Sequence, residues 1–494
     1  MRHLRLLRIA FLLAVFCTSA ALAASAQTFG TLEDFDGSDG SAPWGGSLVQ
    51  GVNGHLYGTT SGGGTNNSGT IFELSTHGLK TLYNFCPTPG CPDGSFPAAG
   101  LALGSDGKFY GTTNAGGIGT SCQNGCGTVF VITPNGKLTT LYNFCSLGNC
   151  ADGSQPIAGL VQGTDGNFYG VTPRDGQYGN GTTFRITPSG NLTTIYSFCA
   201  QSNCLDGSDP AGLVLGTDGN FYGATSAGGG NIIGGTIFKM TRAGAVTTLY
   251  SFCSLPGCAD GAQPGGLMEA NDGNLYGVAT FGGASSNSGT VFRLTRQGKF
   301  STIYTFCAQN PNCPDGARPT GVLVDTNNPN ASLFGTTQWG GTGAAHGGTV
   351  FQMTYNGALT TVHSFCQKPG CSDGATPFAG VFQGTDGNLY GTTNVGGSGC
   401  ESNGCGTIYW VEGEGDPFVQ PVPRFGRVGH TIGILGNNLK QTSSVTFNGV
   451  SASFNVVSDT LIRATVPNGA ATGPIQITTS QGVLDSNVNF YVLP

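Results

Sequence analysis

Repeated acidic residues are the first candidates for chemistry in this chain. Six aspartates each precede a glycine shortly after a pair of cysteines: Asp93, Asp152, Asp206, Asp260, Asp315 and Asp373. A ring of such carboxylates would suit Ca²⁺ or a polyhydroxylated ligand, since oxygen atoms bind both. The alternative is an Asp-Gly turn whose side chain caps its own backbone. Sixfold copying favours the turn, because residues copied into every unit of a repeat protein are mostly structural.

A second set of aspartates lies in DGN or DGK sequences, which are typical of hairpin turns: Asp106, Asp165, Asp218, Asp272 and Asp386. Only the segment Asp34-Phe35-Asp36-Gly37-Ser38-Asp39 approaches the close spacing of oxygen ligands in a calcium loop. We therefore expect no cofactor and no metal, and calcium stays open as an alternative.

Residues that depart from the repeat are better candidates for a specific binding site. Those expected in loops on one face are Trp339, His346, Arg174, Asp175, Tyr178 and Glu401, and Trp44 and Glu269 also lack counterparts. Aromatic rings and arginine stack on sugars or anchor a protein partner. The alternative is ordinary loop variation. The sequence has no G-x-S-x-G elbow between a strand and a helix and no H-E-x-x-H helix, so no catalytic residue is assigned.

Sixteen of the 17 cysteines form eight close pairs, and the remaining one, Cys17, lies near the N-terminus. Even number, local pairing and a secretory signal together predict disulfides formed in an oxidising compartment. Zinc is the rival interpretation, but each pair would need further ligands nearby. The expected bridges are Cys86–Cys91, Cys122–Cys126, Cys145–Cys150, Cys199–Cys204, Cys253–Cys258, Cys307–Cys313, Cys366–Cys371 and Cys400–Cys405.

The elements that must position these residues are short strands. One sequence unit recurs seven times at intervals of fifty to sixty residues, and each unit holds four strand-like runs separated by turn residues. In the unit that begins near Gly190 these runs are 192–198, 211–216, 220–225 and 235–241. Four antiparallel strands in each of seven repeats predict a seven-bladed β-propeller, with a non-closing solenoid as the alternative.

The order of the strands within a blade also follows from the sequence. The small, glycine-bearing AGL run suits the innermost position (A), followed by NFYG (B), GTVF (C) and the outer TTLYNF (D). The chain begins with a D-like strand at 28–35 and ends its last repeat with a C strand at 406–412. We expect these two segments to pair and close the ring, which removes open edges. All cysteine pairs then fall in D–A or B–C connections, on one face that is richer in loops.

Residues 1–26 have the pattern of a signal peptide. Arg2, Arg5 and Arg8 precede a short apolar run, and small residues follow it. That run is too short to span a membrane. The chain has 19 Lys and Arg against 26 Asp and Glu; without the three signal arginines the net charge is 16 − 26 = −10. This acidity disfavours nucleic acid as a partner.

The repeat resembles the GloVer (Gloeo-Verruco) tandem repeat of secreted bacterial proteins, through GT-x-F-x-L-T, G-x-L-T-T-L-Y-x-F and DG-N-x-YG-T-T over residues 28–412. The resemblance implies an exported, propeller-like protein and transfers no catalytic residue. The first copy lacks the cysteine pair. After a linker at 413–418, residues 419–494 resemble an IPT/TIG domain, an immunoglobulin-like β-sandwich, through VGHTIGILGNNL and the turn Asn448-Gly449.

These features predict an all-β, monomeric, secreted, periplasmic or cell-surface protein. In this interpretation the propeller is a non-catalytic platform for an extracellular glycan or protein, and the TIG-like domain is a spacer or accessory. The alternative function is a carbohydrate-active enzyme, a hydrolase or lyase, with its site at the mouth of the propeller. A third hypothesis is a purely structural component of the cell envelope.

Overall fold

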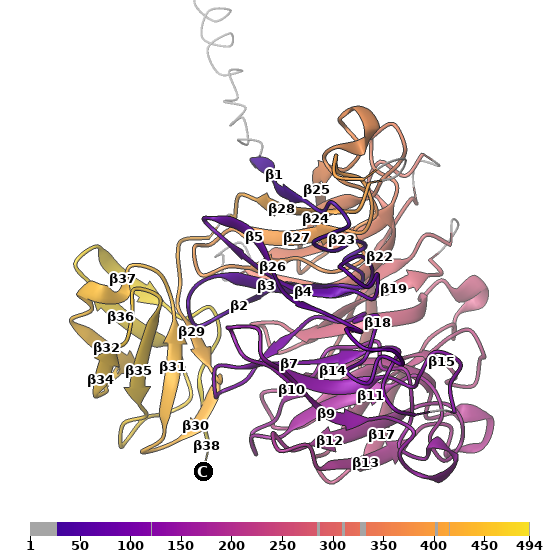
Figure 1. Ribbon diagram of the computed structural model, residues 1–494, viewed down its shortest axis with the longest axis horizontal. Helices are drawn as coiled ribbons and strands as arrows, with labels where there is room; N and C mark the ends of the chain where they lie inside the picture. The colour runs from indigo at the N-terminus through magenta and orange to yellow at the C-terminus, as the bar shows by residue number, and fades with distance from the viewer. Residues whose placement is uncertain are drawn as a thin grey trace, which may run out of the picture.

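The protein is described by a computed structural model covering residues 27–119, 121–283, 287–308, 312–326, 332–400, 404–413 and 415–493. Residues 1–26 and Glu401 lie outside this range, and so do the expectations that concern them. The described residues form an all-β structure with only short 3₁₀ turns as helices (Figure 1): η1 (Gly148–Cys150), η2 (Ser202–Cys204), η3 (Pro256–Cys258), η4 (Pro369–Cys371) and η5 (Leu439–Gln441). None of these helices has the length and hydrophobicity needed to cross a bilayer.

Within the described residues, β1 to β28 build seven four-stranded antiparallel sheets that resemble propeller blades, named here sheets 1 to 7. Sheet 1 contains β2 (Val49–Gln50), β3 (Leu56–Thr60), β4 (Thr70–Ser75) and β5 (Gly78–Asn84). Sheet 2 contains β6 (Ala102–Leu103), β7 (Phe109–Thr113), β8 (Thr128–Ile132) and β9 (Leu138–Asn143). Sheet 3 contains β10 (Val161–Gln162), β11 (Phe168–Thr172), β12 (Thr182–Ile186) and β13 (Leu192–Ser197). Sheets 4 and 5 contain β14 (Ser208–Leu215), β15 (Phe221–Ala227), β16 (Thr236–Met240) and β17 (Val246–Ser251); and β18 (Ala262–Glu269), β19 (Leu275–Phe281), β20 (Thr290–Leu294) and β21 (Phe300–Thr305). Sheet 6 contains β22 (Ala317–Thr326), β23 (Ser332–Trp339), β24 (Thr349–Thr354) and β25 (Leu359–Ser364), and sheet 7 contains β26 (Phe382–Gln383), β27 (Leu389–Thr393), β28 (Thr407–Val411) and β1 (Phe29–Asp34).

Sheet 7 is assembled from both ends of the repeat region. β1 pairs with β28 in antiparallel register, from Phe29 opposite Val411 to Asp34 opposite Thr407. This is the pairing expected from the missing D strand of the last repeat. The hydrophobic core then joins sheet 7 to sheet 1, because Phe35 and Ile408 pack in one cluster with Phe72. Comparable clusters join each earlier sheet to the next one along the chain.

Strand order within the sheets follows the expected A-B-C-D sequence. First strands of consecutive sheets contact each other, as β14 does with β18 and β18 with β22, so these strands are the innermost. Space is limited there: a Cβ on Gly46 would lie 2.8 Å from the backbone nitrogen of Gly100. A second glycine requirement lies in the B strands, where a Cβ on Gly58 would lie 2.4 Å from the ring of Phe72. Glycine is therefore needed where backbones or large rings approach closely.

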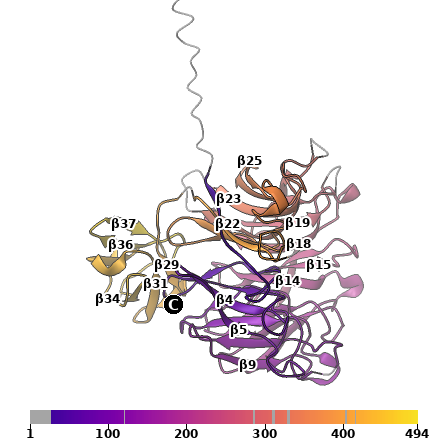
Figure 2. The same cartoon turned by 45° about the horizontal axis from the view of Figure 1, so that its top comes forward.

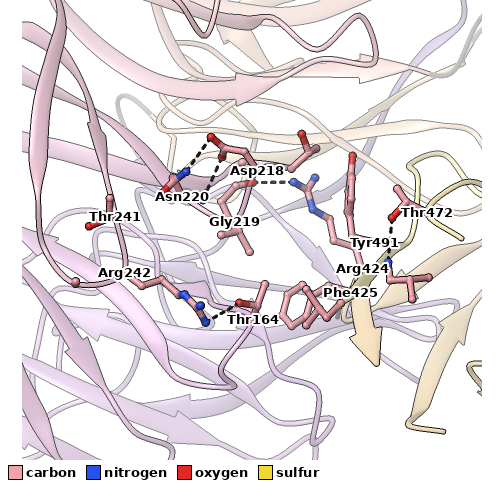
Figure 3. A pocket seen from close by; sticks show the side chains of 16 residues that line it. Thr164, Asp218, Gly219, Asn220, Thr241, Arg242, Arg424, Phe425, Thr472 and Tyr491 are labelled. Atoms are coloured by element: carbon pink, nitrogen blue, oxygen red, sulfur yellow. Dashed lines mark hydrogen bonds between the residues drawn. The ribbon is translucent and has the colours of Figure 1, made fainter. Parts of the chain in front are cut away.

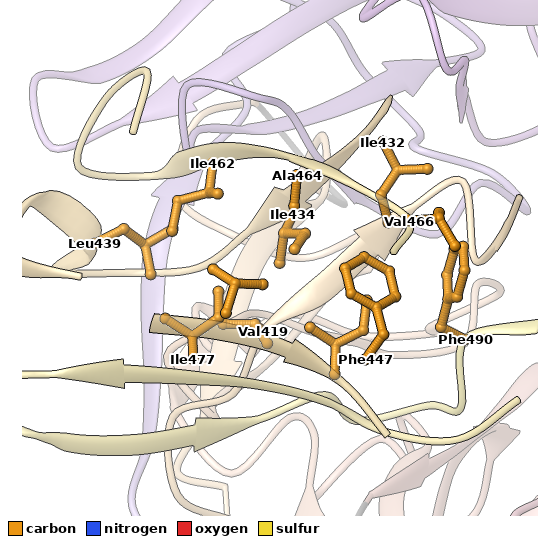
Figure 4. Packing of buried hydrophobic residues seen from close by; sticks show 12 residues of the cluster. Val419, Ile432, Ile434, Leu439, Phe447, Ile462, Ala464, Val466, Ile477 and Phe490 are labelled. Carbon is orange, nitrogen blue, oxygen red and sulfur yellow. The ribbon is translucent and has the colours of Figure 1, made fainter. Parts of the chain in front are cut away.

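The C-terminal domain is a small sandwich of two four-stranded sheets. One contains β29 (Gln420–Val422), β31 (Thr431–Leu435), β35 (Leu461–Thr465) and β34 (Phe454–Val456), and the other β33 (Val450–Ser451), β32 (Ser444–Phe447), β36 (Ile475–Thr479) and β37 (Gly482–Asp485). A parallel pair, β30 (Phe425–Arg427) and β38 (Tyr491–Leu493), completes it. Its core is aliphatic around an edge-to-face contact between Phe447 and Phe490 (Figure 4). The domain therefore has its own core without disulfides.

The sandwich lies against one side of the assembly of sheets. In both views the yellow domain sits beside the indigo and purple sheets (Figures 1 and 2), and Figure 1 shows β29 and β30 on the side nearest to them. Hydrogen bonds cross the contact from Thr460 Oγ1 to the carbonyl oxygen of Val52 and from Asn437 Nδ2 to Thr385 Oγ1. Val52 and Thr385 both lie in turns between A and B strands. The sandwich therefore covers the face formed by the short hairpins.

Candidate ligand-binding face

The opposite face, called the loop face below, is formed by the D–A and B–C connections. All eight cysteine pairs lie in these connections, and each pair forms the disulfide that was expected. The two described groups with metal-ligand proximity, Cys122 with Cys126 and Cys145, and Cys145 with Cys150 and Asp175, use sulfurs that are already bridged. The thiols are therefore accounted for by disulfides, and the zinc interpretation is not needed.

The sixfold Asp-Gly carboxylates hold the disulfide loops onto the sheets. Asp206, for example, is fully buried and accepts hydrogen bonds from Tyr196 Oη at 2.8 Å and from the backbone nitrogens of Ala200 and Gln201. Burial, followed by this contact with the carboxylate, raises the pKa of Tyr196. These aspartates are therefore structural, as expected, but their hydrogen bonds differ from those of a simple Asp-Gly turn. They cap backbone five to eight residues upstream and bind a tyrosine of the outer strand, rather than capping only their own turn.

The same bond recurs from sheet to sheet. The tyrosine–aspartate pairs, at 2.8–2.9 Å, are Tyr83–Asp93, Tyr142–Asp152, Tyr196–Asp206, Tyr250–Asp260 and Tyr304–Asp315. In the sixth copy the tyrosine is replaced by His363, whose Nε2 lies 3.3 Å from Asp373 Oδ2. The DGN and DGK aspartates behave as expected for turns; Asp165 accepts from the backbone nitrogen of Asn167 and from Tyr169 Oη.

All three aspartates of the N-terminal acidic segment accept backbone hydrogen bonds. Asp36 Oδ1 accepts from the backbone nitrogens of Ser38 and Asp39, and Asp39 Oδ1 accepts from the nitrogen of Asp36. Asp34 Oδ2 accepts from the backbone nitrogen of Ser398. These bonds account for the spacing that resembled a calcium loop.

A ring of seven residues, called the rim, occupies the inner border of the loop face. Each rim residue precedes a proline at the start of an inner strand and has φ between +49° and +54°: Ala42, Phe96, Gln155, Asp209, Gln263, Arg318 and Thr376. Left-handed φ is unusual for residues other than glycine. It is imposed here by a backbone hydrogen bond to the preceding sheet, as from Gln155 to Cys126 and from Arg318 to Ser288. The backbone is thus the same in every repeat, whereas the side chain differs.

A second ring lies beside the rim, at the end of each B strand. Its members form β-bridges with the residue before the rim position: Gly62, Ala115, Arg174, Ala227, Phe281, Trp339 and Val395. Arg174 and Trp339, both candidates from the sequence, occupy equivalent places in sheets 3 and 6. They are therefore separated around the ring and not brought together.

The remaining sequence candidates lie farther out in the same two loops. Asp175 Oδ2 accepts a short hydrogen bond from Ser154 Oγ, which ties it to its own sheet. Tyr178 is exposed, and its carbonyl oxygen accepts from Asn180. His346 is exposed with a left-handed φ of 49°, and its Nδ1 lies 3.1 Å from the carbonyl oxygen of Gly341. Asp175 and Tyr178 thus follow Arg174, and His346 follows Trp339.

Exposed aromatic side chains gather on the loop face. Among the described residues, the large aromatic side chains that are strongly exposed are Trp44, Phe96, Tyr178 and Trp339. All four belong to D–A connections or to the B–C side of the sheets. Trp44 packs on Phe378 of the neighbouring sheet 7, with ring centroids 5.4 Å apart. The sequence had indicated Trp44 and Trp339 as departures from the repeat, but not Phe96, which looks like a normal member of the motif DGSFP.

Two cavities lie on the hairpin side, where the sandwich docks. One, of about 390 Å³, is bordered by inner strands and by the segment from Gln420 to Phe425. The other, of about 600 Å³, lies between the turn at Asp218 and β38 (Figure 3). Arg242 reaches Thr164 across it, and Arg424 Nη2 donates to the carbonyl oxygen of Leu215 at 2.7 Å. The sandwich therefore borders the inner strands on this side.

Glu269 anchors this contact. It is 2% exposed and accepts hydrogen bonds from the backbone nitrogen and hydroxyl of Thr217. It also forms a close ion pair with Arg296, and Arg424 Nη2 lies 3.9 Å from its Oε2. Burial lowers the pKa of Arg424. Sequence reasoning noted Glu269 but missed its partners, because Arg424 lies in the other domain.

Comparison with known proteins gives the family. The model of the Gloeobacter/Verrucomicrobia repeat matches residues 18–234, 120–328 and 214–425, and the IPT/TIG domain model matches residues 419–492. A search of curated proteins found no match.

Solved structures resemble the chain only weakly. A protein provisionally named as a gluconolactonase is 12% identical at a TM-score of 0.37, covering 79% of this chain and 93% of its own. A Bacteroides fragilis protein provisionally named as a 6-phosphogluconolactonase is 18% identical at 0.45, covering 70% and 90%. A Bacteroides thetaiotaomicron protein of unknown function is 15% identical at 0.41, covering 78% and 76%. Likenesses this weak carry no argument about activity.

Proposed function

Because the chain belongs to the Gloeobacter/Verrucomicrobia repeat family and carries a TIG domain, we propose that it is an exported, non-catalytic ligand-binding protein. In this proposal residues 1–26 are a signal peptide and residues 28–412 form a closed seven-bladed propeller. Residues 413–418 are the linker, residues 419–494 form the TIG domain, and the mature protein is a monomer. Eight disulfides are consistent with an extracellular location, since such bonds persist in oxidising compartments.

The observation that carries the proposal is the rim, where the repeats keep one backbone conformation and change the side chain. Left-handed φ at a residue other than glycine costs free energy, and such strain concentrates at functional sites. The surrounding loops are cross-linked by disulfides, so the rim is rigid. A rigid frame with variable side chains is the arrangement that proteins use for recognition.

Exposed apolar surface supports the same face. Of the strongly exposed large hydrophobic side chains in the described part of the propeller, only Leu32 and Val322 lie in strands away from the loops. The others are on the loop face: Trp44, Phe96, Ile118, Leu147, Ile157, Tyr178, Leu205, Ile232, Ile233, Leu255 and Trp339. Exposed apolar side chains that concentrate on one face support a binding role for that face. The ligand we propose is an extracellular glycan.

The TIG domain acts, in this proposal, as a cap rather than as a spacer. Its segment from Gln420 to Phe425 borders the cavity among the inner strands, and Arg424 reaches into the hairpin face. Ligands would therefore approach from the loop face only. The alternative of a carbohydrate-active enzyme gains no support from the repeated carboxylates, because they accept structural hydrogen bonds.

Binding of the mature protein to an array of plant, fungal and bacterial polysaccharides tests this function. We expect binding to at least one glycan, and a loss of about 10-fold or more in affinity for the double variant Trp44→Ala/Trp339→Ala, which removes exposed rings from the loop face. The matched control is Val483→Ala, an exposed apolar residue of the TIG domain. Turnover of a bound glycan would refute the non-catalytic proposal, and absence of any binding would refute the glycan platform.

A further inference from the structure

Three departures from the repeat converge on one spot of the loop face. In the second ring only Phe281 and Trp339 are aromatic, and they belong to the adjacent sheets 5 and 6. In the rim only Arg318 carries a positive charge, and it lies between these two sheets, since its backbone nitrogen donates to Ser288 of sheet 5 at 2.7 Å. Phe281 belongs to one repeat, whereas Arg318 and Trp339 belong to the next, where they lie on the paired strands β22 and β23.

The geometry makes the guanidinium the centre of this group. The Cζ atom of Arg318 lies 5.2 Å from the ring centroid of Phe281 and 5.7 Å from that of Trp339, within the range of cation–π contact. The indole of Trp339 is 49% exposed, so one of its surfaces remains free for a ligand. The left-handed backbone of Arg318, with φ of 54°, fixes the direction in which the side chain leaves the rim.

Arg318 has no carboxylate partner among the described residues, although the protein is acidic. The contrast within the ring is the pair Arg174 and Asp209 in sheets 3 and 4. There burial raises the pKa of the Asp209 carboxyl, and the positive charge of Arg174 opposes this effect. At the equivalent border of sheets 5 and 6 the arginine faces aromatic rings instead, and its charge stays available to an anion.

We propose that Phe281, Arg318 and Trp339 form a subsite for a uronic acid residue of an acidic polysaccharide. The sugar carboxylate pairs with the guanidinium, which matches carboxylates in a planar, two-pronged geometry. The apolar face of the pyranose ring stacks on the exposed indole. A second pair of rings on the same face, Phe378 in sheet 7 and Trp44 in sheet 1, offers a further stacking surface for a polymer of repeating sugar rings. This assignment rests on the proposed glycan-binding function and specifies its ligand class.

The structure itself supplies conservative variants for the test. Glutamine occupies the rim position at Gln155 and Gln263 with the same backbone, so Arg318→Gln is expected to fold normally. Alanine occupies the second ring at Ala115 and Ala227, which makes Trp339→Ala equally mild. Arg463→Gln is the matched control, because it removes an exposed arginine from the TIG domain, away from the loop face. Thermal unfolding of each variant verifies the fold.

The experiment measures binding of the mature protein to polygalacturonate, to its fully methyl-esterified form and to polyglutamate at two salt concentrations. We expect binding to polygalacturonate, weakened about 10- to 100-fold by Arg318→Gln or by esterification, since both remove the charge-assisted contact. Trp339→Ala should weaken binding to both forms of the polysaccharide, and Arg463→Gln should leave affinity within about twofold.

Each of the other possible outcomes refutes a specific part of the proposal. Equal binding of the acidic and esterified polymers, or full affinity in Arg318→Gln, overturns the uronate subsite but leaves a glycan-binding protein. Tighter binding of polyglutamate than of polygalacturonate assigns the subsite to an acidic protein partner and overturns the sugar. Absence of binding to any of these polymers overturns the subsite, and the wider polysaccharide array then decides separately whether the proposed function also fails.

Discussion

Substitution of His363 by tyrosine is expected to stabilise the protein, and to do so more at pH 5 than at pH 7.5. Five repeats place a tyrosine hydroxyl 2.8–2.9 Å from the aspartate of the disulfide loop, and the sixth places His363 near its buried counterpart, Asp373. The position accepts a tyrosine ring, because His363 stacks on Phe29 with centroids 3.5 Å apart as Tyr250 stacks on Phe300 at 3.8 Å.

Two effects set the magnitude. At neutral pH the new bond to the Asp373 carboxylate should contribute about 1–2 kcal/mol to the free energy of unfolding. In acid a further effect arises, because burial lowers the pKa of His363 below its ordinary value of 6.5 despite the opposing effect of Asp373. A group with a lowered native pKa takes up its proton more readily when unfolded, so stability falls as pH drops below 6.5. At pH 5 the loss can reach about 2 kcal/mol, and tyrosine removes it.

Thermal unfolding of the wild type and of His363→Tyr at the two pH values measures both effects. For a chain of this size about 1–2 kcal/mol corresponds to a rise in Tm of about 1–3 °C at pH 7.5, with about twice that rise at pH 5. His363→Phe serves as the control that keeps the stacked ring and lacks the hydroxyl. A lower Tm for His363→Tyr than for the wild type at pH 7.5 would refute the repeat bond. An equal gain at both pH values would refute the pKa reasoning.

Three further outcomes follow from the contacts described above. Asp206→Asn should lower the free energy of unfolding by about 3 kcal/mol in denaturant titration, because the buried side chain loses the charge-assisted bonds to Tyr196 and to the backbone. Asp165→Asn, at an exposed turn, should lower it by about 1 kcal/mol or less. Equal losses for the two variants would contradict the structural role of Asp206. Arg424→Met should weaken docking of the TIG domain on the hairpin face by about 3 kcal/mol and increase the radius of gyration in small-angle scattering. Arg463→Met, at an exposed position of the sandwich, is the control. An unchanged scattering profile for Arg424→Met would count against the TIG domain as a cap on this face. Replacing Cys199 and Cys204 together by serine should lower the free energy of unfolding by about 2 kcal/mol, the chain-entropy value for so small a loop. The circular dichroism spectrum should still show folded sheets. Loss of the whole β signal would show that this disulfide stabilises more than its own loop.

Much of the architecture followed from the sequence because it depends on local patterns that are repeated. The four strand runs per unit, the DGN turns and the cysteine pairs are each complete within a few residues, and copying makes their order unambiguous. Pairing of β1 with β28 also followed, since a D strand was present at one end of the repeats and missing at the other. The same copying limited what could be said of chemistry, because it hid Phe96 among ordinary members of its motif.

The site itself depends on how separate repeats meet in space. Of Phe281, Arg318 and Trp339, the sequence had indicated only Trp339 as a departure from the repeat. Phe281 belongs to one copy and the other two to the next, and only the packing of sheet 5 against sheet 6 brings the phenylalanine ring to the arginine. Likewise, nothing local in Glu269 indicates Arg424, because their contact requires the TIG domain to dock on the hairpin face. Backbone pattern is encoded over short distances, and the sequence alone determined it. Contacts between side chains of different repeats and domains depend on the angle at which those units pack, and only the tertiary structure decided them.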